Sequence, residues 1–96
     1  MNKTRAPLKT IVVDDELLSI NLMKSILQKI PEIEIVAECS NGREAIAQTN
    51  QQAPDLLFLD IQMPGINGFQ VVQALQSDVM PMIVFATAFD LSLIHI

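Results

Sequence analysis

Apolar residues in this chain gather in four short runs, of which the first, residues 8–13, is rich in β-branched side chains. Short apolar runs bounded by turn-forming or acidic residues are typical of buried β-strands. The predicted strands cover residues 8–13, 33–39, 55–59 and 82–86. The third run is the most apolar, which favours a central place in a sheet. The second run begins by alternating apolar and acidic residues, as a strand nearer an edge does.

Three helices are predicted between these strands. In residues 17–30 apolar side chains recur at helical spacing, and Pro31 ends this run because a residue that precedes proline avoids the helical conformation. The second helix begins after Asn41, which can cap it, and Glu44 stands in the capping-box position three residues later. The third helix covers roughly residues 68–77. Its inward-facing residues are predicted to be Phe69, Val72 and Leu75.

Strands that alternate with single helices predict an α/β fold. Each strand-helix-strand unit implies a right-handed crossover between parallel strands, and successive crossovers place helices on both faces of the sheet. In such sheets, functional groups collect beyond the carboxyl ends of the strands, near the point where the strand order reverses. The residues that follow each strand are therefore the first candidates for a site.

Polar residues stand at the carboxyl ends of three predicted strands. Asp14 and Asp15 follow the first strand, Asp60 follows the third, and Thr87 lies at the end of the fourth. If the first and third strands are neighbours, the three acids share a pocket, where two carboxylates ~4 Å apart repel by about 4 kcal/mol at an effective dielectric constant near 20. A divalent cation offsets such repulsion, and all-oxygen ligation favours Mg²⁺ over zinc.

With Mg²⁺ bound, Asp60 is predicted to attack an incoming phosphoryl group, and Thr87 to donate a hydrogen bond to a phosphoryl oxygen. Each residue also has a plainer explanation. Asp14 and Asp15 can act as acids at the start of the following helix. Asp60 can cap the turn before Pro64, and Thr87 can be an ordinary strand-end residue. Their joint occurrence at three strand ends favours the phosphoryl-transfer site.

Composition restricts the possible functions further. The 96 residues fit one domain, half of them are hydrophobic, and the net charge is −5. The six Lys and Arg residues are scattered, with none after Arg43, which argues against direct binding of nucleic acid or anionic membranes. Cys39 is the only cysteine, so no internal disulfide can form. No apolar stretch is long enough to span a bilayer, and we predict a cytoplasmic protein.

Three segments of the sequence together resemble the receiver domain of two-component response regulators. They are the segments "VVDDE", "LLFLDIQMPGINGF" and "IVFATAF", and the resemblance covers residues 8 to about 90. It implies a flavodoxin-like parallel sheet with strand order 2-1-3-4 and a signalling domain that is not an enzyme. It also implies a sensor histidine kinase as partner and, in the full-length parent protein, a DNA-binding output domain. The ending "FATAFD" is similar to receivers that precede LytTR-type domains.

The resemblance also assigns roles to single residues. Asp60 is expected to be the phosphoacceptor and, with Asp15, a direct ligand of Mg²⁺. Asp14 is expected to act on the ion through water, and Gln62 to offer its backbone carbonyl oxygen. Thr87 is expected to be the switch hydroxyl that moves toward the phosphoryl group, whose added charge drives the change of state.

The sequence departs from the receiver pattern toward its end. Receivers carry a Lys followed by Pro at the end of a fifth strand, and no lysine occurs here after Lys29, so no catalytic lysine is present. The resemblance therefore implies that the fifth strand and the last two helices are missing. We expect residues 1–7 to be an N-terminal tail, 8–90 a partial receiver domain and 91–96 a non-native tail. His95 receives no role.

Three other functions compete with this interpretation. An aspartyl-phosphate phosphatase of the haloacid-dehalogenase type needs a second acid two residues after Asp60, where Gln62 stands. A flavin-binding flavodoxin-like protein needs a phosphate-cradling loop after the first strand, where acids stand instead. A non-phosphorylated interaction module with the same fold remains an alternative, and the response to Mg²⁺ distinguishes it from a receiver.

Overall fold

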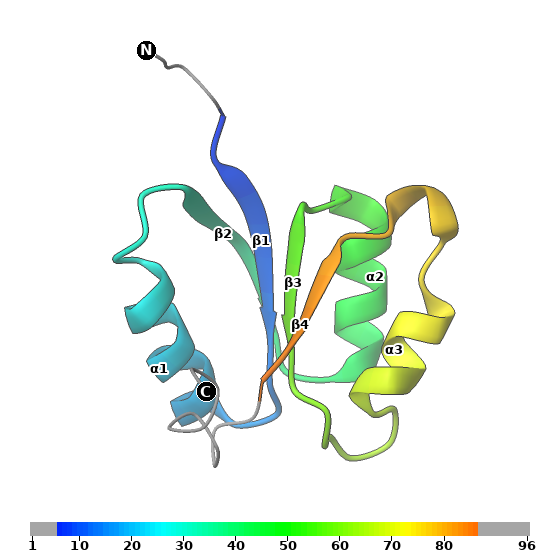
Figure 1. The fold of residues 1–96 in the computed structure, drawn as a ribbon. Coiled ribbons are helices and arrows are strands. Elements are labelled where there is room, and N and C mark those ends of the chain that lie inside the picture. Colours follow the sequence, from blue (N-terminus) through cyan, green and yellow to red (C-terminus); the bar gives the residue numbers. More distant parts are fainter. Residues whose placement is uncertain (1–5, 87–96) are drawn as a thin grey trace.

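A four-stranded parallel sheet runs through residues 6–86, the part of the chain that the computed structural model describes (Figure 1). The strand order is β2-β1-β3-β4, as predicted, with β3 inside the described sheet and β2 at one edge. Every neighbouring pair of strands is parallel. The strands are β1 (Leu8–Val13), β2 (Ile33–Cys39), β3 (Leu56–Leu59) and β4 (Met82–Phe85).

Helices cover both faces of this sheet, as the alternation of elements predicts. Figure 1 shows α1 on one side of the sheet and α2 and α3 together on the other. The helices are α1 (Leu17–Leu27), α2 (Gly42–Gln52), α3 (Gly68–Ala74) and the short 3₁₀ helix η1 (Ser77–Val79). Helix α1 ends earlier than predicted, because the N–H of Ile30 bonds to the carbonyl of Leu27 in a tighter turn before Pro31.

The strand register aligns the carboxyl ends of β1, β2 and β3. Val13, the last residue of β1, pairs with Cys39 of β2 and with Leu59 of β3. Hydrogen bonds continue one step past the strands, from the N–H of Asp14 to the carbonyl of Cys39 and from the N–H of Asp60 to the carbonyl of Val13, both 3.1 Å. The residues that follow β1 and β3 therefore lie side by side.

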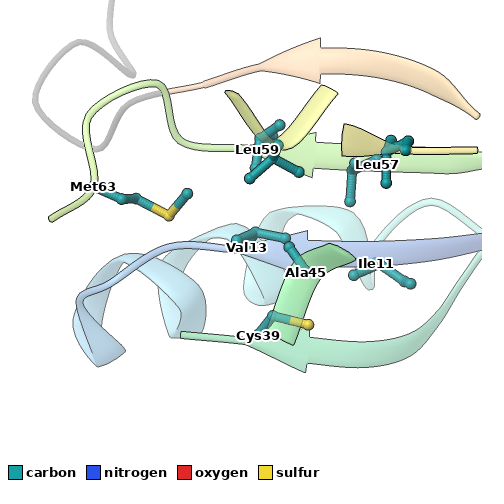
Figure 2. Close-up of a cluster of buried hydrophobic side chains, with 9 residues drawn as sticks. Ile11, Val13, Cys39, Ala45, Leu57, Leu59 and Met63 are labelled. Carbon is teal, nitrogen blue, oxygen red and sulfur yellow. The ribbon is translucent and has the colours of Figure 1, made fainter. Parts of the chain in front are cut away.

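The core has two layers, one on each face of the sheet. Figure 2 shows part of the layer under α2 and α3, where side chains of the strands meet Ala45 of α2. The buried residues of this layer are Ile11, Val13, Cys39, Ala45, Leu57, Leu59, Met63, Val71 and Leu75. The layer under α1 consists of Val12, Ile20, Met23, Leu27 and Ala86. Both faces of β1 are thus buried, as is typical of a central parallel strand.

The inward face of α3 differs from the prediction. Phe69 is 54% exposed, whereas Val71 and Leu75 are buried and Val72 is half-buried. The helix starts at Gly68 with Asn67 as its cap, and its packing on the sheet turns Val71 into the core. The ring of Phe69 instead contacts the ring of Phe85 at the end of β4, with centroids 5.0 Å apart.

Helix α1 also exposes more apolar surface than its pattern suggests. Leu18 is 83% exposed, and Leu22 and Ile26 are each 45% exposed, although all three lie in the helical apolar pattern. The side chains that pack on the sheet are Ile20, Met23 and Leu27. Among residues 6–86, no helix combines the length and the apolar character needed to cross a bilayer.

Candidate metal centre

Three carboxylates converge at the carboxyl edge of the sheet. Asp14 and Asp15 follow β1 and Asp60 follows β3, and one carboxylate oxygen from each lies within 4.8 Å of the others. Asp14 and Asp60 are buried, with 1% and 7% of their surface exposed, whereas Asp15 is exposed. The predicted convergence is therefore present, and it follows from the adjacency of β1 and β3.

Backbone hydrogen bonds hold the two buried carboxylates. Oδ1 of Asp14 accepts a hydrogen bond from the main-chain N–H of Glu16 at 2.9 Å. In the same way, Oδ1 of Asp60 accepts from the N–H of Gln62 at 3.2 Å. The other oxygen of Asp14, Oδ2, is buried and has no hydrogen-bond partner among the described residues. A buried carboxylate oxygen without a partner is costly, so this atom needs a ligand or a cation.

The electrostatics of the cluster oppose ionisation of its two buried acids, Asp14 and Asp60. Burial raises the pKa of Asp14 from 3.8 to about 6; the N–H of Glu16 opposes this shift, and the charges of Asp60 and Asp15 add to it. Burial also raises the pKa of Asp60, against the N–H of Gln62, while the charges of Asp15 and Glu16 raise it further. In the absence of a cation, the folded protein therefore keeps negative charge in a place that disfavours it.

The donor set suits a hard divalent cation. The three side chains offer carboxylate oxygens only, which are the ligands that Mg²⁺ prefers and which zinc sites seldom use alone. The unpartnered Oδ2 of Asp14 and the raised pKa of two of the acids both indicate a position that positive charge would complete. The residues present thus fit Mg²⁺.

The structure places some, but not all, of the other predicted site residues. Gln62 is exposed, and its main-chain N–H contacts the carboxylate of Asp60, so its peptide group lies beside the cluster. Thr87 lies outside the described residues, as does the tail predicted at 91–96. Sequence reasoning missed the charge contribution of Glu16, although its place directly after Asp15 was a usable signal. It also missed Gly68, whose backbone packs against Asp60.

Comparison with known proteins identifies the family. The sequence model of the response regulator receiver domain matches residues 10–94, most of the chain. The chain is 48% identical over 83 residues to "Transcriptional regulatory protein BtsR" of Salmonella typhi and to its namesake in Escherichia coli K12. In both cases the match covers 86% of this chain and 35% of the relative. The chain therefore belongs to the response regulator receiver domain family, and it spans about a third of the length of these curated relatives.

Solved structures agree with the fold. The receiver domain of the putative response regulator NarL from Mycobacterium tuberculosis superposes with a TM-score of 0.77 at 27% identity, over 84% of this chain and 66% of that one. The response regulator domain of Thermotoga maritima CheB gives a TM-score of 0.79 at 23% identity, over 88% of this chain and 63% of that one. The described sheet and helices thus have the flavodoxin-like arrangement of receiver domains.

Proposed function

We propose that this chain is the phosphoacceptor part of a two-component response regulator and that Asp60 receives the phosphoryl group. The observation that supports the proposal most is the arrangement of Asp60 itself. Its carboxylate follows a buried strand, lies within 4.8 Å of carboxylate oxygens of Asp14 and Asp15, and is 7% exposed. A nucleophile on a rigid strand end, next to a cation site, suits phosphoryl transfer.

In this proposal the ion is held by the three acids and one peptide group. Asp15 and Asp60 would bind Mg²⁺ directly, the backbone carbonyl of Gln62 would supply a further oxygen, and Asp14 would act through a water. Its unpartnered Oδ2 is available to accept a hydrogen bond from that water. When bound, Mg²⁺ supplies positive charge that offsets the acids and the oxygens of the transferred group.

The chemical step is a displacement at phosphorus. A carboxylate oxygen of Asp60 forms a bond to the phosphorus of a phosphohistidine, the P–N bond breaks, and its electron pair leaves with the imidazole. The products are an aspartyl phosphate and a free histidine of a sensor kinase. Asp60 must be ionised to attack; burial raises the pKa of its carboxyl, and a neighbouring cation would favour the ionised form.

The signal is then passed to a part of the parent protein that lies beyond this chain. The relatives named transcriptional regulatory proteins are nearly three times as long as the matched region, which supports an output domain that regulates transcription. Thr87 serves as the switch hydroxyl that follows the phosphoryl group, within a receiver portion that covers residues 8–90. The domain itself transmits a signal and turns over no free substrate.

Titration with Mg²⁺ tests the cation site. The chain has no Trp or Tyr, so amide resonances in ¹H–¹⁵N spectra replace intrinsic fluorescence as the probe. We expect MgCl₂ to shift the resonances of residues 14–16 and 60–62 with a dissociation constant in the millimolar range. Asp60→Asn should abolish these shifts, whereas Asp78→Asn, the same change at an exposed position before β4, should leave them intact. A wild-type chain that does not respond to Mg²⁺ would instead support the non-phosphorylated interaction module.

Acetyl phosphate tests the acceptor. We expect intact-mass measurement to show slow addition of one phosphoryl group in the presence of Mg²⁺, because the printed sequence has no lysine after Lys29 to pair with that group. Reduction with borohydride followed by peptide mapping should locate the group on Asp60. Addition that persists in Asp60→Asn, or that needs no Mg²⁺, would contradict the proposal.

A further inference from the structure

We infer that Gly68 is a positioning residue for Asp60, an inference that rests on the proposed role of Asp60 as phosphoacceptor. Gly68 is the first residue of α3, and its backbone packs directly against the main chain of the acceptor. A Cβ atom at this position would lie 2.6 Å from the carbonyl oxygen of Asp60 and 3.0 Å from Cα of Ile61. Ordinary contact begins at 3.4 Å, so a side chain of any size requires the backbone to move.

Position 68 needs glycine because there is no room for a Cβ atom, and not because its backbone adopts a positive φ. Among the described glycines, the positive φ belongs to Gly65, at 78°. The groups that a Cβ at Gly68 would meet are all backbone atoms, which cannot turn away as a flexible side chain can. The N–H of Gly68 also donates to the carbonyl of Ile61 at 2.9 Å, so the start of α3 is bonded to the segment on which it presses.

Both partners in this contact are held in place. The start of α3 is held by a capping box, in which Asn67 and Gln70 each bond the other's main-chain N–H at 2.9 Å. The loop that precedes it is held by α2, because a Cβ at Gly42 would lie 2.8 Å from Cβ of Ile66 and 2.9 Å from its carbonyl oxygen. Neither the helix nor the loop can retreat freely.

A side chain at Gly68 would therefore displace the peptide group between Asp60 and Ile61. That peptide sets the direction of the Asp60 side chain, which is short and whose Oδ1 is bonded to the N–H of Gln62. A shift there moves a proposed ligand and the peptide of Gln62 together, away from Asp14 and Asp15 on the neighbouring strand. Changes to the groups that orient a metal ligand typically weaken metal binding about 10- to 100-fold.

Two Gly→Ala variants of the full chain separate positioning from stability. Gly68→Ala should shift the Asp60 and Ile61 amide resonances in metal-free protein and weaken Mg²⁺ binding about 10-fold or more in the same titration. Gly65→Ala is the matched control, since its Cβ would meet nothing within 4 Å while its positive φ strains an alanine. We expect Gly65→Ala to lower the urea midpoint but to keep Mg²⁺ affinity within about twofold of wild type.

The outcomes distinguish the two proposals. A folded Gly68→Ala chain with wild-type resonances at Asp60 and Ile61 and wild-type Mg²⁺ affinity would overturn the positioning role. A wild-type chain without Mg²⁺ binding would defeat the proposed function, while the metal-free resonances of Gly68→Ala still decide whether Gly68 positions Asp60. If Gly68→Ala does not fold, Asn67→Ala loosens the same helical turn without adding an atom. It should shift the same resonances and weaken Mg²⁺ several-fold, and the absence of both effects would overturn the inference.

Discussion

Asp60 donates its main-chain N–H to the carbonyl oxygen of Val13, 3.1 Å away, so the residue after β3 is bonded to the last residue of β1. Because Asp14 follows Val13 directly, this bond brings the two buried carboxylates to the same edge of the sheet. Burial, followed by the neighbouring charges, then raises the pKa of both carboxyls. The acidic cluster is therefore a consequence of strand pairing. Its contribution to the free energy of unfolding depends on pH and on bound cations.

Stability without Mg²⁺ should fall as the pH rises from about 4 to about 6. The pKa of Asp14 is about 6 in the folded protein and near 3.8 when unfolded, so in this window the folded state holds a proton that the unfolded state has released. Raising the pH then favours unfolding, by a total of about 3 kcal/mol. Urea denaturation followed by circular dichroism in EDTA measures the change. A free energy of unfolding that rises through this range, or an equal dependence in Asp14→Asn, would contradict the assignment.

Asp14→Asn should have opposite effects with and without Mg²⁺. In EDTA near neutral pH, we expect the variant to be about 1–2 kcal/mol more stable than wild type, because it removes a buried charge beside two others. At Mg²⁺ ten times its dissociation constant, wild type should gain about 1.4 kcal/mol and the variant much less. Thermal unfolding in EDTA and in MgCl₂ gives both values. Asp78→Asn, at an exposed position, should match wild type in both conditions; equal stabilisation of Asp14→Asn by Mg²⁺ would exclude Asp14 from the site.

Truncation of a buried leucine in β3 should lower the free energy of unfolding more than truncation of a partly exposed leucine in α1. Leu57 of β3 is fully buried, and Leu57→Ala should cost about 2–5 kcal/mol of unfolding free energy because it leaves a cavity under α2 and α3. Leu22 of α1 is 45% exposed, so Leu22→Ala should cost less than about 1 kcal/mol. Urea midpoints of the two variants decide the matter. Similar costs would mean that the exposed side of α1 is covered in solution.

Cys39 should be inert in the folded protein. The residue is 1% exposed, and burial, with the charge of Glu44 adding to it, raises the pKa of its thiol to about 11. Because the thiolate is the reactive form, we expect almost no reaction with Ellman's reagent at neutral pH until the chain unfolds. The labelling rate should then increase with urea in parallel with loss of the circular dichroism signal. Rapid labelling in buffer would show that the end of β2 opens locally.

The sequence by itself determined the order of strands and helices and the position of the acids directly after β1 and β3. Period and local chemistry carry this information: short apolar runs form strands, Asn41 caps α2 through the N–H of Glu44, and Asp14 and Asp60 each follow an apolar run. These features depend on neighbours in the chain or on the general rules of βαβ units.

Only the tertiary structure decided which side chains are buried and how closely the elements approach. Phe69 was predicted to face inward and is exposed, because the packing of α3 on the sheet sets its phase around Val71. The unpartnered oxygen of Asp14 and the contact of Gly68 with Asp60 likewise depend on the relative placement of segments far apart in the chain. The periodicity of a sequence describes repetition along one helix or strand. It gives no distance between two elements, so the side chains buried between them follow only from the tertiary structure.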